Sequence, residues 1–271
     1  MVLGTLFLFW SQGVPADGYT LKYKLDKGKV LRYSNTMTQQ ISQEIMGMKN
    51  EGSTTISSEV TVTGEGETAD GNIAAVVTYD SITIDLTSPM GNSNLHNPPA
   101  WIGKRVRKVI DSSGDQISTQ NLDTFSSPGP GQELPTAIEF FFNLPKDEVF
   151  LNQSAMVFDE DAFEISGLKV SPKSEMEYTV LGEEKLRGYD CVKIAVKGGV
   201  GLTGEGQNSG MDMKLNGDGT MEGTLYFAPE EGLLVMMESS STVETQVNIT
   251  GPQEMTIPQT QSVKSKMELI K

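Results

Sequence analysis

Long runs of alternating apolar and polar residues, separated by short turns rich in glycine, are the feature that most constrains this fold. Residues 19–25 place four apolar side chains on one face and two lysines on the other, before a turn at residues 26–28. Residues 81–86 alternate in the same way. Successive side chains of a strand point to opposite faces, so these runs predict strands with one buried face. Many such runs joined by turns are typical of an antiparallel meander.

The order of these runs predicts a mainly β protein, built as a curved sheet or half-open barrel of long antiparallel strands. Residues 17–120 are expected to form an N-terminal β half, and residues 145–271 a C-terminal β half. Between them, residues 121–144 are expected to hold a Pro- and Gly-rich linker and one short helix at residues 134–144. Apolar residues at helical spacing before Pro145 indicate that helix.

Three glycine-containing stretches are expected to lie between strands. Residues 46–52 are predicted to form a loop, and residues 199–206 a flexible hairpin loop, because the latter contain Gly at every second or third position. Residues 216–219, with the sequence Asn-Gly-Asp-Gly, are compatible with a tight hairpin turn.

The first sixteen residues carry no charged side chain and contain an apolar run from Val2 to Trp10. This run is too short for a membrane span, which needs about 20 residues. Small residues at Val14 and Ala16 fit a cleavage site, so residues 1–16 are predicted to be a signal peptide, although the basic residues that usually precede the apolar run are missing. The alternative is a buried N-terminal strand. We therefore expect an exported protein, periplasmic or extracellular, without a transmembrane span. No cysteine follows the apolar run, so no N-terminal lipid anchor is expected.

The balance of charges excludes one class of partner. The chain has 21 Lys and Arg residues against 36 Asp and Glu residues, a net charge of −15. A protein this acidic repels nucleic acids and anionic membrane surfaces. We therefore expect no nucleic-acid partner.

Cys191 and His96 are the single cysteine and the single histidine of the chain. A catalytic cysteine needs a neighbouring base and an electropositive setting. His96 lies almost a hundred residues away in a loop-like stretch, and Lys193 is the one nearby cation on the strand face of Cys191. One His and one Cys also cannot supply a zinc site. We therefore expect a packed thiol, an exposed histidine, no catalytic residue and no cofactor.

Two further groups of residues are weighed as sites. Asp159, Asp161 and Glu164 form the densest acidic cluster and are weak Ca²⁺ candidates, although they lack EF-hand spacing. A solvated turn is the alternative. The second group contains the aromatic run at 140–142 and an upstream isoleucine, which could line an apolar pocket or pack in the core. These pocket candidates are Ile138, Phe140, Phe141 and Phe142.

Several segments resemble a family of exported bacterial domains of unknown function. The resemblance rests on residues 21–33, residues 45–48, the Val-Thr-Tyr-Asp-Ser-Ile stretch at 77–82 and the Ser-Pro-Met-Gly stretch at 88–91. Residues 144–149 match the beginning of that family's next motif, whereas residues 152–155 depart from it where the family has Gly and Trp. The resemblance covers most of residues 19–155.

More distantly, residues 178–194 and residues 226–234 are similar to the lipoprotein-carrier superfamily of the LolA and LolB type. The shared pattern is a strand pair entered through Gly-aromatic-x-Cys, followed by a strand that ends in Pro-x-x-Gly. The resemblance implies a half-open antiparallel barrel whose concave face holds acyl chains and is partly closed by helices. Neither family supplies catalytic residues to transfer.

Three functions remain open from the sequence. The first is a non-enzymatic envelope protein that binds an apolar or lipid-like ligand, or a protein partner. The second is a structural or interaction domain with a filled core and no ligand cavity. The third is a carboxylate-based hydrolase, which requires two acids facing one cleft.

Overall fold

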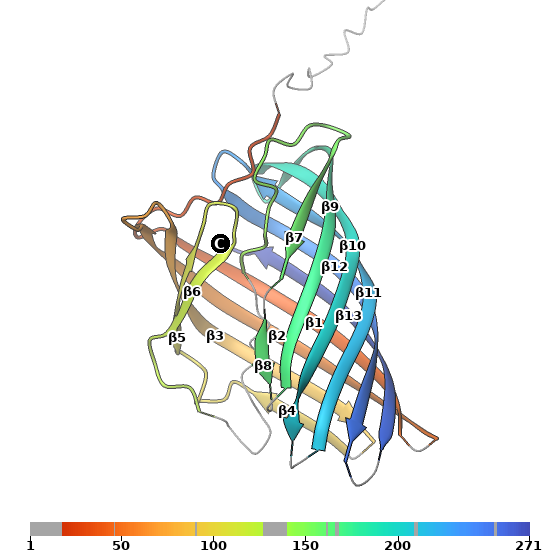
Figure 1. The fold of residues 1–271 in the computed structure, drawn as a ribbon. Coiled ribbons are helices and arrows are strands. Elements are labelled where there is room, and N and C mark those ends of the chain that lie inside the picture. Colours follow the sequence, from red (N-terminus) through yellow and green to blue (C-terminus); the bar gives the residue numbers. More distant parts are fainter. Residues whose placement is uncertain are drawn as a thin grey trace, which may run out of the picture.

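The computed structural model describes residues 18–45, 47–89, 91–126, 140–160, 162–165, 168–208, 211–251 and 254–271 (Figure 1). The predicted signal peptide lies outside these residues. In the described part of the chain no helix is long and apolar enough to cross a membrane.

All named strands belong to one antiparallel sheet of thirteen strands. The strands are β1 (Val30–Ile45), β2 (Met48–Glu67), β3 (Ile73–Ser88), β4 (Gly91–His96), β5 (Arg105–Ile110), β6 (Gln116–Asn121), β7 (Ser154–Asp159), β8 (Phe163–Ile165), β9 (Leu168–Leu186), β10 (Tyr189–Asn208), β11 (Met211–Ala228), β12 (Leu233–Thr250) and β13 (Met255–Leu269). Their spatial order is β6-β5-β3-β2-β1-β13-β12-β11-β10-β9-β7, with β4 beside β3 and β8 beside β9. The prediction of a mainly β, antiparallel fold is confirmed.

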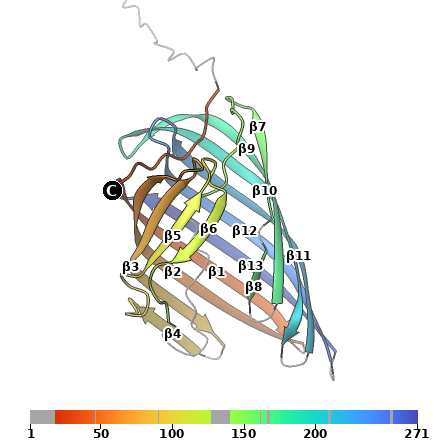
Figure 2. The same ribbon diagram turned by 60° about the vertical axis from the view of Figure 1, so that its left-hand side comes forward.

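The sheet is continuous but not closed. The first and last strands pair, with Tyr33 opposite Leu269 and Gln43 opposite Gln259, so both predicted halves contribute to one sheet. The sheet curls until the β5–β6 side and the β7–β9 side face each other (Figures 1 and 2). It therefore has a concave face, which carries the core residues Leu31 and Leu225, and a convex face.

The glycine-containing stretches lie mainly inside strands, which corrects all three loop expectations. Residues 199–206 belong to β10, residues 216–219 belong to β11, and β2 begins at Met48 directly after a tight turn. Glycine is favoured inside these strands, at Gly198 beside the first stretch and at Gly219, because a larger side chain would not fit. A methyl group on Gly198 would overlap the carbonyl oxygen of Glu175, and one on Gly219 would overlap that of Thr242. Alternate glycines on the concave face thus let neighbouring strands bend sharply toward each other.

Residues 18–29 cover one end of the concave face (Figure 2). They were expected to form a strand, and their alternation holds, because Leu21, Tyr23 and Leu25 are buried. They do not join the sheet ladder, however. The Tyr23 amide donates to Ser112 O at 2.8 Å, and the Lys24 amide donates to Gly232 O at 3.0 Å. The segment is therefore an extended cover over the core, held by backbone hydrogen bonds to these two loops, to Val149 and to Gly64 of β2.

The other end of the sheet has no such cover among the described residues. On β11, residues 211–220 alternate regularly between half-buried concave positions and exposed convex positions. The concave positions carry apolar residues such as Met213 and Leu215, and the convex positions carry Asp212, Lys214 and other polar residues. We call this uncovered part of the concave face the trough.

Candidate ligand cavity

A cavity of about 230 Å³ lies where the covered core meets the trough. Both sides of the open sheet and the chain segment before β7 contribute to its wall. Its lining is apolar, with polar groups at intervals. The residues are Lys108, Ile110, Gly114, Gln116, Phe141, Phe142, Asn143, Val157, Asp159, Ser174, Met176, Tyr178, Val200 and Met221.

The segment 140–144 forms one wall of the cavity and is held by two buried tyrosines. The Tyr23 hydroxyl accepts the Phe142 amide at 3.0 Å and lies 3.2 Å from Phe142 O, to which it can donate. The Tyr178 hydroxyl donates to Asn143 O at 2.7 Å. Burial raises the pKa of both phenols, so they remain protonated donors.

These contacts explain why the expected helix is absent from its described part. Residues 140–144 are irregular, and residues 134–139 lie outside the described residues. A helix would use the backbone groups of Phe142 and Asn143 internally. Here the tyrosines bind those groups, and the Leu144 amide donates to Ser113 O at 2.8 Å.

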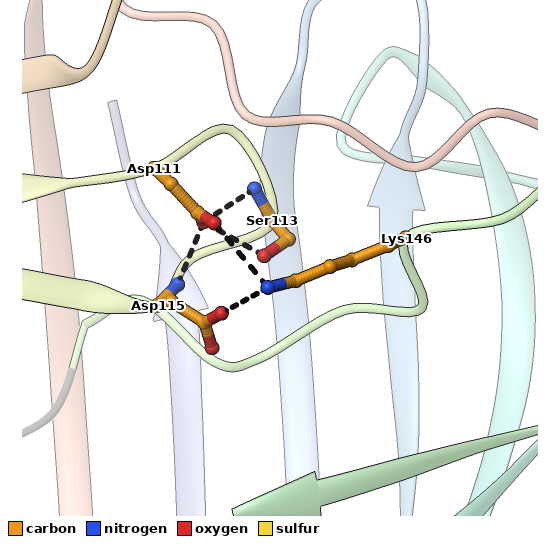
Figure 3. Close-up of polar contacts among 4 residues, drawn as sticks. All are labelled: Asp111, Ser113, Asp115 and Lys146. Carbon is orange, nitrogen blue, oxygen red and sulfur yellow. Dashed lines mark hydrogen bonds and ion pairs between the residues drawn. The ribbon is translucent and has the colours of Figure 1, made fainter. Parts of the chain in front are cut away.

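An ion pair fastens the end of this segment to the β5–β6 turn (Figure 3). Lys146 Nζ lies 3.6 Å from Asp111 Oδ2 and also contacts Asp115. Asp111 Oδ1 accepts hydrogen bonds from the amide and hydroxyl of Ser113, at 2.8 and 2.7 Å, and from the Asp115 amide at 3.0 Å. These hydrogen bonds hold residues 111–115 in the turn that joins β5 to β6.

The pKa of Asp111 lies below its usual value. Burial alone would raise this pKa, but the hydrogen bonds from Ser113 and Asp115, together with Lys146, outweigh the burial. The folded state therefore favours the carboxylate. Its contribution to stability is present above about pH 4, the unfolded pKa, and is lost as the pH falls through the lower folded value.

We expect Asp111→Asn to lower the free energy of unfolding at pH 6 by about 1–2 kcal/mol, because charged hydrogen bonds are lost. At pH 3 the free energies of unfolding of the variant and the wild type should differ less. Urea unfolding at both pH values measures this difference. Asp70→Asn, in the exposed β2–β3 turn, is the control. An equal gap at both pH values would show that the Asp111 charge does not stabilise the fold.

The structure separates the four pocket candidates. Phe141 and Phe142 line the cavity, and the Phe141 ring packs edge-on against Tyr23 with centroids 5.3 Å apart. Phe140 instead lies in the core with 2% of its surface exposed. Ile138 lies outside the described residues. The assignment of these residues to a ligand pocket stays a prediction.

Sequence reasoning missed the larger part of the cavity wall. Met176 and Tyr178 of β9, Val200 of β10 and Met221 of β11 are far apart in the sequence and become neighbours through strand register. Their alternation with polar residues is visible in the sequence. It marks which residues share a face, but not which strands lie side by side.

Cys191 is packed, on the side of β10 opposite the main core. It is 1% exposed and lies in a small cluster with Ala228 and Val235. Its thiol contacts Tyr189 O at 3.7 Å. Lys193, the candidate activating cation, lies 3.3 Å from Glu184 Oε2 and over the Tyr226 ring. Burial raises the pKa of the Cys191 thiol to about 11, which opposes nucleophilic chemistry.

We expect the Cys191 thiol not to react with 5,5′-dithiobis(2-nitrobenzoic acid) in the native protein at pH 8. With this pKa, only about one molecule in a thousand carries a thiolate, and burial blocks access. One thiol per chain should react after unfolding in urea. Absorbance at about 412 nm, where the thiolate released from the reagent absorbs, measures the number of reacted thiols in the native and the unfolded protein. Rapid reaction of the native protein would contradict the packed assignment.

His96 and the acidic cluster are the remaining candidates for a metal site. His96 lies exposed on β4, where Nδ1 is 2.9 Å from the Thr83 hydroxyl. In the acidic cluster, Asp159 lines the cavity. Asp161 and the side chain of Glu164 lie outside the part of the chain that the structure describes. Within the described ranges, no group of three or more His, Cys, Asp or Glu residues is placed to hold a metal ion.

Comparisons with known proteins do not identify a family. No family model matches the sequence, and no curated protein matches it. Similar solved structures include OccK2 (OpdF) of Pseudomonas aeruginosa, 7% identical over 90% of this chain and 98% of that chain, with a TM-score of 0.26. A putative outer membrane lipoprotein-sorting protein domain from Vibrio parahaemolyticus is 8% identical over 88% and 83% of the two chains, with a TM-score of 0.15.

A DUF1329 family protein from Desulfovibrio piger is 10% identical, over 88% of this chain and 85% of that chain, with a TM-score of 0.16. Scores this low describe similar antiparallel strands rather than one shared fold, and they carry no assignment of function.

Proposed function

We propose that this chain is an exported, non-enzymatic envelope protein that holds an apolar, lipid-like ligand in the trough. The observation that carries the proposal is the contrast between the two faces of the same strands. Concave positions of β11 and β13 are uncharged and half-buried and include apolar residues such as Met213, Leu215 and Val263, whereas convex positions are mostly polar and exposed. Half-exposed apolar side chains on a concave surface gain free energy when a ligand covers them.

The size of the cavity fits one end of such a ligand. Pockets that enclose a whole drug-sized molecule measure about 300–1,000 Å³, whereas this cavity measures about 230 Å³. Val200 and Met221 belong to the cavity wall and also begin the trough. An elongated chain can therefore insert its end beside Phe141 and lie with its remaining length along the trough.

The alternatives receive less support. A structural domain with a filled core accounts for the covered end of the sheet, but not for the apolar trough. A carboxylate hydrolase needs two facing acids. Among the described residues that line the cavity, Asp159 is the one carboxylate. A protein partner could also cover the trough, and the experiment below separates that reading from ligand binding.

The test uses two neighbouring residues of β12 that point to opposite faces. Val243 is half-buried in the trough, and Thr242 is exposed on the convex face. With the uncharged fluorescent probe N-phenyl-1-naphthylamine, we expect Val243→Glu to weaken binding at least about tenfold, because an unpaired charge is placed in an apolar site. Thr242→Glu should bind the probe like the wild type.

Fluorescence titration measures both affinities, and urea unfolding confirms that both variants fold. Absence of probe binding to the wild type would overturn the proposal and favour a structural or protein-binding role. Equal weakening by both substitutions would place the probe outside the trough.

A further inference from the structure

Four glutamines lie together in the trough, on the concave faces of β1 and β13. They are Gln39, Gln43, Gln259 and Gln261, and all four are half-buried. Gln43 and Gln259 are direct cross-strand partners, and Gln261 lies opposite Ile41, between Gln39 and Gln43. Direct partners have Cβ atoms about 5 Å apart, so the side chains are neighbours. We call these four residues the glutamine patch.

The amides of the glutamine patch are available for hydrogen bonding. In the described part of the chain, none of the four side-chain amides forms a hydrogen bond. Each amide offers two donors and a carbonyl acceptor. Covering such groups with a purely apolar ligand would cost free energy, because their bonds to water would be lost without replacement. The patch therefore favours a ligand with hydrogen-bonding groups of its own.

Charge is absent from the same surface. The concave positions of β1, β11, β12 and β13 hold no Asp, Glu, Lys or Arg along the trough, whereas convex positions hold Lys214, Asp218, Glu244, Lys264 and others. Lys108 and Asp159 line the cavity at the two sides of the sheet, and each already takes part in an interaction within the protein. A charged ligand group in the trough would lose hydration without gaining a counter-ion.

We infer that the ligand is an uncharged amphiphile whose ester, amide or hydroxyl groups bind the glutamine patch. This inference rests on the proposed function of the trough. The apolar chain would contact the residues that flank the patch on the same face, including Ile41, Val243 and Val263. The patch thus determines which polar group is accepted, and the apolar residues supply most of the affinity.

Three competitors with the same twelve-carbon chain test the selectivity. They are 1-monolauroylglycerol, which is neutral, dodecyl sulfate, which is anionic, and dodecyltrimethylammonium, which is cationic. Each is titrated below its micelle concentration against bound N-phenyl-1-naphthylamine. We expect the neutral compound to displace the probe at a concentration at least about tenfold lower than either ionic compound. Its hydroxyl and ester groups exchange water for the glutamine amides, whereas the ionic groups lose hydration without a counter-ion.

A double variant tests the patch itself. Gln43→Met with Gln259→Met keeps the side-chain shape and removes two amides. We expect its affinity for 1-monolauroylglycerol to fall about tenfold, the effect of losing two ordinary hydrogen bonds, whereas its affinity for the largely apolar naphthylamine probe should stay the same or rise. Gln40→Met, an exposed convex position of β1, is the control and should change neither affinity.

The outcomes separate the two proposals. If the probe does not bind the wild type, the proposed function fails. If the probe binds but the three competitors act equally, or the folded double variant keeps its affinity for 1-monolauroylglycerol, the inference fails while ligand binding stands. If the double variant does not fold, the competitor series on the wild-type protein decides.

Discussion

Replacing Gly198 by alanine is expected to lower the free energy of unfolding by about 3 kcal/mol, the upper range for overpacking. The added methyl group would overlap the carbonyl oxygen of Glu175 on β9 and lie 2.7 Å from the Met176 sulfur. The sulfur can move, but the carbonyl belongs to the paired backbone of the neighbouring strand. The two strands must therefore separate locally, which weakens the hydrogen bonds between β9 and β10 and widens the cavity at Met176.

Gly199→Ala is the matched control, one residue further along β10. No atom lies within 4 Å of the position that its methyl group would take. Because glycine within a strand costs about 0.5–1 kcal/mol relative to alanine, this variant should be as stable as the wild type or more stable. Urea unfolding of both variants gives the comparison. A Gly198→Ala variant as stable as Gly199→Ala would falsify the steric account of sheet curvature.

Phe227→Ala is expected to lower the free energy of unfolding by about 3–5 kcal/mol, the usual cost of removing a buried aromatic ring. Phe227 is fully buried, and its ring packs edge-on against Tyr23 with centroids 5.4 Å apart. Tyr23 in turn binds the backbone of Phe142. The substitution therefore removes packing beneath the cover at residues 18–29 and weakens the support of the cavity wall.

Phe158→Ala makes the same chemical change at an exposed site. Phe158 lies on the edge strand β7 and is 68% exposed, so its removal should change stability by less than about 0.5 kcal/mol. Thermal or urea unfolding measures the pair of variants. Similar losses for both phenylalanines would show that the covered end of the sheet is not the main core. Protease cleavage within residues 18–29 should rise for Phe227→Ala alone, because the cover opens more often.

The class of the fold was predictable because it depends on local alternation. A two-residue period appears directly in stretches such as residues 81–86, and it determines which side chains share a face. The glycine stretches were wrongly predicted to be loops, because glycine is common both in turns and where two strands approach closely. Gly198 and Gly219 are distinguished only by the neighbouring carbonyls of Glu175 and Thr242, which belong to other strands. Sequence periodicity holds no information on those partners.

The candidate site was predictable only in part, for the same reason. An aromatic run is visible in the sequence, and two of its members, Phe141 and Phe142, line the cavity. The irregular backbone there depends on Tyr23 and Tyr178, whose partners are 119 and 35 residues away. A local helical spacing cannot compete with such distant hydrogen bonds once the sheet has formed. The trough likewise becomes a surface only when β1 lies beside β13.

The pairing of β1 with β13 also bears on how the chain is made. Tyr33 cannot meet Leu269 before the residues between them have left the ribosome. Until then, two partial sheets expose unpaired backbone at β1 and β12. Contacts between distant residues slow folding and leave such edges open to aggregation. Completion of the sheet is therefore a late step, and the edges of β1 and β12 stay unpaired until β13 is available.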